Sequence, residues 1–556
     1  MKQVKRLTAL LLAAMILLCA GCGDQEVEEK GLEIRAAFIE EPVTLDPAYA
    51  TNEEERTIVV HLFENLMKFT SAGLVGGQAA SYDVTVNDDG TETYTFTLRS
   101  DIFWSDGVAV TAEDFVHAWQ RLVSPQIASP NREILRMVAG YEAAIAGDMA
   151  ALQVSAPDSR TFVVTLSEHC TYFLPVVCTD SATMPVRTDV VPRWMKVEAE
   201  EQQGGGEEEE VLPQVTEPDW TMKKSTLIAN GAYAVRNFNA GHLTVVEAED
   251  YYDNHRLGPK KIDFFFAGSA ERALDSYNKH ESDFILKCDT LEDSVVVQRP
   301  ETMVLVVNQM SSFSEELRQA LSLSLDRNAV AAVAGSQYIG AEGLVPQGIM
   351  TTSGAVFRQV NGPVTPCDEA SVEKNRTHAR DLIASFHRGG IYAMERLGVV
   401  SLIYESGVVN ARVVQQVKQQ WQDMLGITVE TVAVESEAMG KTLASGAFSI
   451  ALMSVSDVTN TATGYLDSYI SDSYDNYGQH YSNAYDILLR AADASDSKEA
   501  RDAYLADAER LLLESGYVIP LCNSTYRYLF RPTMTGLLQY DMGVYDFSGV
   551  TEIPVT

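Results

Sequence analysis

One stretch, residues 98–125, constrains the fold of this chain more than any other. It is written LRSDIFWSDGVAVTAEDFVHAWQRLVSP. Ser105-Asp106-Gly107 has the composition of a turn, and its glycine can take the positive φ that such turns need. Thr111 is placed to cap a helix, with Asp114 in the first turn. The stretch therefore predicts a strand, a turn and a capped helix that ends by Pro125.

The predicted helix carries one apolar face, because Phe115, Trp119 and Leu122 recur at intervals of three or four residues. With the strand and turn before it, the helix resembles the signature region of the family 5 extracellular solute-binding proteins, the oligopeptide and dipeptide receptors of ABC importers. The agreement covers many positions at fixed spacing, so it is specific. The positions that carry it are Leu98-Arg99, Asp101, Trp104-Ser105-Asp106-Gly107, Thr111-Ala112-Glu113-Asp114-Phe115 and Trp119-Gln120-Arg121-Leu122.

Two other stretches extend this resemblance. Residues 41–47, EPVTLDP, followed by Phe63-Glu64-Asn65-Leu66, match the start expected of the family. Residues 317–327, LRQALSLSLDR, match its second strong motif. The resemblance covers roughly residues 31–550. It implies an α/β, two-lobed fold like that of the type II periplasmic binding proteins, with an extra small α+β domain inserted in lobe one. The lobes of such a protein close on a solute by hinge motion.

The domain organisation is predicted from the resemblance and from changes in composition. Residues 197–210 hold seven Glu, two Gln and three consecutive Gly, which cannot bury a core, so we expect a flexible acidic surface loop there. The expected parts are a signal peptide (1–21), a tether (22–30), lobe one in three parts (31–70, 185–307 and 517–556), a small subdomain inserted in lobe one (71–184) and lobe two (308–516).

Local patterns predict individual elements. Alternating apolar residues on both sides of Asp88-Asp89-Gly90 predict a β-hairpin, and a second hairpin is predicted around residues 156–160. A late helix is predicted to turn one face inward. The residues of that face are Ala500, Tyr504, Ala508 and Leu511.

A βαβ unit is predicted in the second lobe. Residues 399–404 have the pattern of a strand, and Val414 to Leu425 that of a helix that stops at Gly426. Residues 427–429 have the pattern of the next strand. A strand, a helix and a strand in this order indicate a parallel sheet.

The first 22 residues have the features of a bacterial export signal. Three basic residues precede an apolar run of 13 residues, from Leu7 to Cys19, which is shorter than a membrane span requires. The run ends in Leu18-Cys19-Ala20-Gly21-Cys22, which resembles a lipobox, although Cys19 stands where Leu is usual. We expect cleavage before Cys22 and a diacylglyceryl group on its thiol, which would anchor the mature chain to the outer side of the cell membrane. The alternative is a signal peptide without lipid.

The chain is strongly acidic. Its formal net charge is −36, and loss of residues 1–21, which hold three basic residues and no acidic one, leaves −39. Such a surface repels nucleic acid and anionic lipid headgroups, so we expect no nucleic-acid partner. The charge would suit cationic solutes, although acidity more often serves solubility.

The sequence lacks the motifs of the common catalytic sites. It contains no Gly-x-Ser-x-Gly, no His-Glu-x-x-His and no phosphate-binding glycine loop, so we expect no enzyme. The cysteines beyond Cys22 form no Cys-x-x-Cys pair and have no His cluster beside them, so we expect no metal and no cofactor. The cysteines beyond Cys22 are Cys170, Cys178, Cys288, Cys367 and Cys522. Cys170 and Cys178 either pair as a disulfide or remain buried free thiols.

These observations predict an extracytoplasmic receptor that captures peptides by lobe closure and delivers them to the permease and ATPase subunits of an ABC importer. Backbone hydrogen bonds would bind the main chain of the peptide and tolerate varied side chains. We expect a monomer. Two alternatives stay open: the same fold binding a non-peptide solute such as a metal chelate or a sugar, and a peptide-sensing receptor that serves signalling.

The predicted ligand site departs from the family pattern at one place. Many peptide receptors carry Gly-Trp-x-x-Asp-Tyr in lobe two, where the Asp pairs with the α-amino group of the peptide. In this chain Val455 stands at the Trp position and Val458 at the Asp position, and Asp457 comes one residue earlier. Successive side chains of an extended segment point to opposite faces, so this shift puts the pairing in doubt.

A buried ammonium group needs a carboxylate partner, and three arrangements stay open. The backbone shifts so that Asp457 turns inward, or Glu41 in the first cleft-bordering loop takes its place, or the ligand has no free ammonium group. Tyr404, at the end of a predicted strand, and Asn460, just beyond Asp457, complete the predicted ligand-binding residues.

Replacing the predicted lipidation site tests the anchor. In Cys22→Ala the thiol that would carry the lipid is gone, so we expect the exported protein to leave the membrane fraction. Cys19→Leu, which restores the usual lipobox residue, should stay membrane-bound. Cell fractionation with immunoblotting measures both, and a Cys22→Ala protein as membrane-bound as the parent contradicts the prediction.

Overall fold

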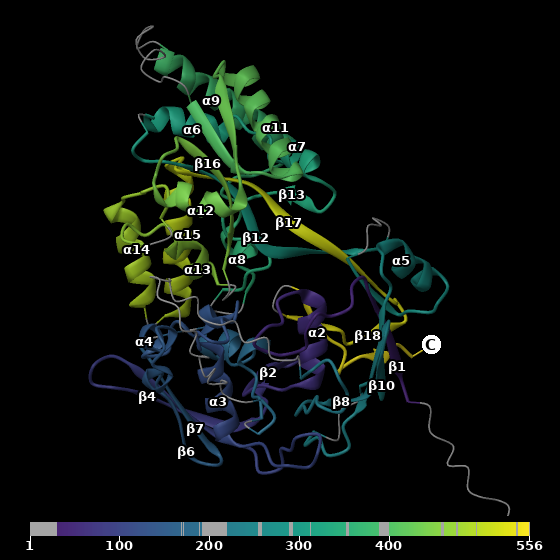
Figure 1. Ribbon diagram of the computed structural model, residues 1–556. Coiled ribbons are helices and arrows are strands. Elements are labelled where there is room, and N and C mark those ends of the chain that lie inside the picture. The colour runs from purple at the N-terminus through teal and green to yellow at the C-terminus, as the bar shows by residue number, and fades with distance from the viewer. Residues whose placement is uncertain are drawn as a thin grey trace, which may run out of the picture.

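Two lobes joined by two long strands make up the computed structural model of the protein (Figure 1). It describes residues 31–167, 170, 172–187, 189–191, 220–253, 258–287, 293–311, 313–351, 355–387, 400–457, 461–473, 476–495, 497–540 and 543–554. Within these ranges, no helix combines the length and apolar character needed to cross a membrane. The signal peptide, Cys22, Cys288, the acidic loop at 197–210 and Asn460 lie outside them.

A single large sheet runs through both lobes. Among the described residues it has eleven strands, in the order β15-β14-β16-β12-β17-β11-β1-β10-β9-β8, with β13 (Tyr338–Gly340) paired to β17 beside this path. Its middle consists of β12 (Val295–Val307) and β17 (Val518–Phe530), which are antiparallel and 13 residues long each. The sheet is therefore mixed, and its two central strands belong to both lobes.

The pairing of β12 with β17 is interrupted between the lobes. Val295 to Gln298 pair with Tyr528 to Thr525 on the lobe-one side, and Val304 to Val306 pair with Pro520 to Val518 on the lobe-two side. The register shifts between Gln298 and Thr302 and again between Met303 and Val304. Such shifts bend a strand pair locally. The expected boundaries at 307/308 and 516/517 fall at the lobe-two ends of these strands, while the strands themselves run through both lobes.

Lobe one is built on β1 (Glu33–Phe38), which pairs in parallel with both β10 and β11. The ring of Phe38 is fully buried, and its centroid lies 5.5 Å from that of Phe264 and 6.5 Å from that of Phe284. The other elements of lobe one are α2 (Glu53–Leu62), β2 (Met67–Thr70), β3 (Gly73–Gly76), β8 (Tyr233–Asn239), β9 (His242–Glu247), β10 (Lys261–Phe266), α5 (Ala270–Asn278), β11 (Phe284–Leu286), β18 (Met534–Thr535), β19 (Leu538–Tyr540), β20 (Val544–Asp546) and β21 (Thr551–Glu552).

The small subdomain carries its own antiparallel sheet, in the order β4-β5-β7-β6. Both predicted hairpins are confirmed: β4 pairs with β5 around Gly90, whose φ is 87°, and β6 pairs with β7. The elements are β4 (Ala79–Val86), β5 (Glu92–Leu98), α3 (Ala112–Leu122), η1 (Arg132–Leu135), α4 (Tyr141–Ile145), η2 (Met149–Ala151), β6 (Val154–Asp158), β7 (Thr161–Leu166), η3 (Phe173–Val177) and η4 (Ser181–Thr183).

Helix α3 forms as the sequence predicts. The carboxylate of Asp114 accepts hydrogen bonds from the backbone N–H and the hydroxyl of Thr111, at 2.9 and 3.0 Å. Gly107 has the expected positive φ, 83°. Trp119 is fully buried, and its ring meets that of Phe162 on β7 edge to face, with centroids 5.1 Å apart. The capped, amphipathic helix thus covers one face of the subdomain sheet.

A buried ion pair ties α3 to the first loop of lobe one. Both guanidinium NH₂ groups of Arg121 donate to the carboxylate of Asp46, at 2.9 and 2.7 Å. The indole N–H of Trp220 donates to the same carboxylate at 2.8 Å. The side chains of Arg121 and Asp46 are 1% and 4% exposed. The two motifs that carried the resemblance, LDP and WQRL, therefore meet in the fold.

The βαβ unit predicted in lobe two is confirmed, because β14 and β15 are parallel neighbours joined by α11. Strand β15 begins at Val429, two residues later than predicted, because the chain leaves α11 through Gly426 with a φ of 70°. The elements of lobe two are α6 (Glu315–Leu323), α7 (Arg327–Ala334), α8 (Phe357–Asn361), α9 (Glu369–His387), β14 (Val400–Glu405), α11 (Val408–Leu425), β15 (Val429–Val434), α12 (Ser436–Ala444), β16 (Ile450–Ser456), α13 (Ala462–Asp467), α14 (Asn483–Asp493) and α15 (Lys498–Glu514).

The late helix exists, and its predicted face is confirmed only in part, because Ala508 is buried and Leu511 packs against the core. In α15 the side chain of Tyr504 is 37% exposed, while Leu505 and Leu512 are buried. Apolar residues occur on several sides of this helix, so periodicity alone did not single out the face that packs.

No disulfide bond joins the described cysteines. Cys170 and Cys178 are both buried and unbridged, which decides between the two alternatives. Burial raises the pKa of the Cys178 thiol well above its usual value. It also raises the pKa of Cys367 to about 11 and that of Cys522 to about 12. These thiols are therefore protonated at neutral pH.

Breaking the pair between Arg121 and Asp46 tests its structural role. Arg121→Met leaves a buried carboxylate without its cation, so we expect a loss of about 3–5 kcal/mol in the free energy of unfolding. Arg380→Met removes an arginine whose ion pair with Glu373 is half exposed, and should cost less than about 1 kcal/mol. Urea denaturation measures both, and equal losses would show that the buried pair is not special.

Candidate functional site

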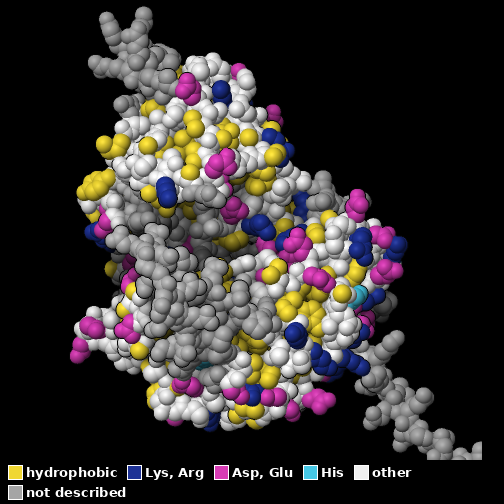
Figure 2. All heavy atoms as spheres, in the orientation of Figure 1, with side chains coloured by type: hydrophobic (Ala, Val, Ile, Leu, Met, Phe, Trp, Pro, Cys, Tyr) yellow, Lys and Arg dark blue, Asp and Glu magenta, His cyan; other side chains and the backbone are white. Residues whose placement is uncertain are grey.

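The two lobes meet at the carboxyl end of β16. Ser456, the last residue of this strand, pairs with Glu301, which lies on β12 between the lobe-one and lobe-two pairings. In the space-filling view the surface is hollowed between the lobes, and acidic and basic side chains lie along the hollow (Figure 2). The end of β16 therefore lies close to the interlobe boundary.

One edge of β16 is open along most of its length. Its other edge pairs with β12 from Ile450 to Ser456. On the open side, β14 pairs with β16 at Ile450 and Ala451, and no other strand in the described ranges pairs with it from Leu452 onward. An unpaired strand edge presents N–H and C=O groups in a row, which makes it a template for an added strand. An extended chain can therefore bind there by main-chain hydrogen bonds.

Asp457 follows directly after β16 and is 7% exposed. Its Oδ2 accepts a hydrogen bond from the backbone N–H of Thr461 at 3.2 Å. Gly464, on α13, lies so close that an added Cβ would come within 2.1 Å of that oxygen. The carboxylate is thus held against the start of α13, and Gly464 is required to leave room for it.

The small subdomain places a cation opposite this carboxylate. Burial by itself lowers the pKa of Arg136, but the net shift of its pKa is upward, because Tyr172 and the carboxylates of Asp457 and Asp467 stabilise the charged guanidinium. Arg136 and Tyr172 belong to the subdomain, while Asp457 and Asp467 belong to lobe two. The two bodies therefore interact electrostatically across the boundary.

Asp467 lies at the end of α13 and has an unusual protonation equilibrium. Burial, followed by the negative charges of Asp493 and Asp457, raises the pKa of its carboxyl from 3.8 to about 7. Arg136 and Arg501 act in the opposite direction. This carboxyl is therefore close to half protonated at neutral pH.

The residues predicted from the sequence do not come together in one cluster. Glu41 is exposed, and its carboxylate accepts a hydrogen bond from the backbone N–H of Gly241, in the turn between β8 and β9 of lobe one. Tyr404 packs against the lobe-two core on the face that holds Leu402, whereas Ile403 packs with Ala451 on the opposite face. Asp457 lies at the lobe boundary. Asn460 lies outside the described residues, so its role stays a prediction.

Sequence reasoning missed Arg136, Tyr172 and Asp467. Arg136 follows the 3-10 turn η1, and Tyr172 precedes η3. Neither turn has a periodic pattern, and the carboxylates that act on Arg136, those of Asp457 and Asp467, lie far away in the sequence. Tyr172 was visible as part of the segment Tyr172-Phe173-Leu174-Pro175, but nothing in that segment indicates which side chain faces lobe two.

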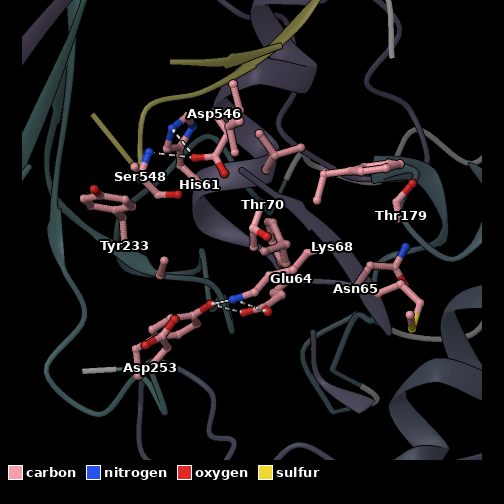
Figure 3. A pocket seen from close by; sticks show the side chains of 18 of the residues that line it. His61, Glu64, Asn65, Lys68, Thr70, Thr179, Tyr233, Asp253, Asp546 and Ser548 are labelled. Carbon is pink, nitrogen blue, oxygen red and sulfur yellow. Dashed lines mark hydrogen bonds and ion pairs between the residues drawn. The ribbon is translucent and has the colours of Figure 1, made fainter. Parts of the chain in front are cut away.

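A cavity of about 390 Å³ lies within lobe one, beyond the carboxyl end of α2. Figure 3 shows His61, Asp546 and Ser548 at one end of it and Glu64 and Lys68 at the other. His61 is buried: its Nδ1 lies 2.6 Å from the carbonyl oxygen of Thr57, and its Nε2 accepts from the backbone N–H of Phe547 at 3.0 Å. His61 therefore ties α2 to the C-terminal segment.

The other end of this cavity is a compact polar network. The carboxylate of Glu64 accepts hydrogen bonds from the hydroxyls of Tyr251 and Tyr252, the latter at 2.6 Å. The ammonium group of Lys68 lies 3.2 Å from Glu64 and donates to the hydroxyl of Tyr251 at 2.9 Å.

The amino end of helix α2 lies near the strands that join the lobes, because Glu53 on α2 pairs with Arg299 on β12 at 2.7 Å. The cavity is thus at the opposite end of α2 from the lobe boundary, and its polar groups bind one another.

The described residues offer no metal site. No group of three or more His, Cys, Asp or Glu side chains in those ranges is arranged to hold a metal ion. The chemistry that the lobe boundary does offer is a strand edge, a buried carboxylate and a guanidinium.

Comparison with known proteins gives one family and a set of relatives. The model of the bacterial extracellular solute-binding proteins, family 5 Middle, matches residues 73–477. The periplasmic murein peptide-binding protein MppA of Escherichia coli is 25% identical over 515 residues, which cover 89% of this chain and 88% of the relative. The probable deoxycholate-binding periplasmic protein YgiS of the same organism is 26% identical over 526 residues, covering 91% of each.

Solved structures show the same fold. The unliganded open form of MppA superposes with a TM-score of 0.73, at 24% identity, over 91% of this chain and 94% of the other. Another structure of the E. coli protein gives 0.63, at 22% identity, over 95% and 99%.

The raised pKa of Asp467 predicts a pH dependence of stability. Because the pKa of this carboxyl is higher in the folded chain than in the unfolded one, it contributes to the free energy of unfolding. This contribution is fully present below about pH 4 and is lost as the pH rises through about 7. Asp467→Asn removes this titration. Between pH 4 and pH 8 we expect the free energy of unfolding to fall by about 2–4 kcal/mol more in the parent than in the variant. Urea denaturation across this range measures it, with Asp507→Asn, at an exposed position, as the control. Parallel curves for parent and Asp467→Asn would contradict the assignment.

Proposed function

Since the chain belongs to the bacterial extracellular solute-binding proteins of family 5, whose model matches more than half of it, we propose that it captures a peptide between its lobes outside the cytoplasm and hands it to an ABC importer. The observation that carries the proposal is the open edge of β16 from Leu452 to Ser456, at the lobe boundary. An extended peptide that adds a strand to this edge is held by its main chain, whatever its side chains.

Closure of the lobes completes the site. The lobes are joined by β12 and β17, whose pairing is interrupted between Gln298 and Thr302. Bending there would bring lobe one over a peptide that lies on β16. We propose that residues 71–184 move with lobe one, because Asp46 and Arg121 tie α3 to its first loop. Closure would then also change the approach of Arg136 to lobe two.

We further propose that the mature chain begins at Cys22, is anchored by lipid on that residue and works as a monomer with the permease and ATPase subunits of the importer. The lipobox-like residues Leu18 to Cys22 support the anchor. The polar, acidic residues 23–30 would then form a tether between the lipid and β1, which starts at Glu33.

A non-peptide solute is the second candidate, and two observations favour it. One relative of similar identity is a probable deoxycholate-binding protein. In addition, Val458 stands where peptide receptors of the family carry the acid that pairs with the amino group. Native mass spectrometry separates the two candidates: the purified protein is offered a mixed tetrapeptide library and deoxycholate together. Retention of peptides supports the proposal, and retention of deoxycholate alone contradicts it.

The amino end of the peptide provides a sharper test. If Asp457 pairs with the α-ammonium group, Asp457→Asn should weaken binding by about 2–5 kcal/mol, the loss for truncating one partner of a buried charge pair. Calorimetry with a bound peptide and its N-acetylated form measures this, and acetylation should cost a similar amount. Glu41→Gln is the matched control, because Glu41 is exposed and bonded within lobe one. Equal affinity for both forms would exclude Asp457 as the partner, and a loss in Glu41→Gln instead would transfer the role to Glu41.

A further inference from the structure

A second cavity, of about 170 Å³, lies on one face of the lobe-two sheet. Its floor is apolar: Val306 on β12 and Met453 and Val455 on β16. Tyr469 and Tyr477 form its walls, and Ser454, Ser456 and Ser468 complete the lining. None of the described residues that line it is charged. A binding role for this cavity rests on the proposed peptide-binding function, because the cavity would hold one side chain of the captured peptide.

The cavity adjoins the open edge of β16. Met453 and Val455 share a face of the strand with Ala451, because side chains alternate along it. Tyr477 and Met453 both pack against the cluster that contains Ile403 of β14 and Ala451 of β16. The lining of the cavity therefore extends from Val306 on β12 across β16, toward the edge that β14 leaves open beyond Ala451. A strand added there would lie about 4.8 Å from β16 and turn every second side chain toward this face.

The size and chemistry of the cavity select among side chains. An engineered cavity of about 150 Å³ lined by apolar side chains is large enough to bind benzene, so 170 Å³ holds a phenyl ring. A charged side chain would lose its hydration without gaining a partner, which costs several kcal/mol. Alanine would leave most of the space unfilled.

We propose that this cavity is a side-chain subsite that takes an aromatic or large apolar residue of the bound peptide, with Val455 setting its size. Val455 is 8% exposed and forms part of the floor. A larger residue at this position would occupy the space that the ligand side chain fills. The receptor thus binds the peptide main chain generally but prefers an apolar ring at one position.

Titration calorimetry with five peptides tests this: tetra-alanine and the four peptides in which one alanine is replaced by phenylalanine. Burying a phenyl side chain contributes about 1.5–3 kcal/mol, so one of the four should bind about 10- to 100-fold tighter than tetra-alanine. The same position occupied by lysine should bind no tighter than alanine.

Two variants connect the preference to the cavity. Val455→Trp should reduce the favoured phenylalanine peptide to the affinity of tetra-alanine. Val432→Trp, at an exposed position of β15, is the matched control and should leave the preference intact. If Val455→Trp lowers the melting temperature too far for binding studies, Tyr477→Ala serves instead. It removes a wall, so the preference should move from phenylalanine toward tryptophan by about fivefold or more.

The outcomes separate the subsite from the function on which it rests. Equal affinity for all five peptides, an unchanged preference in folded Val455→Trp, or a preference for lysine overturns the subsite and leaves peptide binding standing. Failure of all five peptides and of the mixed library to bind overturns both.

Discussion

The long antiparallel pair of β12 and β17 is the constraint on which the rest of the structure depends. It places the lobe-one strands and the lobe-two strands in one sheet, so the two lobes are connected through strand pairing. The buried apolar clusters divide along the same line: Phe38, Phe264 and Trp119 belong to one cluster, while Leu402, Trp421 and Ile450 belong to another. Each lobe is therefore packed around its own apolar core, and the two strands that join the lobes change register between them.

This division explains how the site is built. The buried pair of Asp46 and Arg121, together with the shared core, joins the small subdomain to lobe one. The open edge of β16 and the cavity beside it belong to lobe two. A bound peptide would thus lie on one body and be covered by the other, and Arg136 interacts electrostatically with Asp457 and Asp467 across the same boundary. The proposed subsite and the proposed closure therefore concern the same surfaces.

The elements that the sequence predicted well are local. The capped helix α3, the two hairpins and the parallel βαβ unit each depend on residues a few positions apart, and the resemblance supplied the two-lobed fold. The pairing of β12 with β17 joins residues more than 200 positions apart, and no periodic pattern encodes it. The same holds for Arg136 with Asp457. Glu41 and Tyr404 were predicted from their positions in the chain. In the structure the Glu41 carboxylate accepts a hydrogen bond from Gly241, and Tyr404 packs against the lobe-two core.

The distance between the lobes, measured with and without peptide, tests closure about the β12–β17 pair most directly. Spin labels attached through unnatural amino acids at Lys279, just after α5, and Glu373 on α9, both exposed on their lobes, would report it by pulsed electron resonance. A second pair, at Lys279 and Asp158, lies within lobe one and its subdomain. We expect saturating peptide to shift the first distance to a shorter value and to leave the second unchanged. An unchanged interlobe distance in protein that calorimetry shows to be peptide-bound would contradict closure.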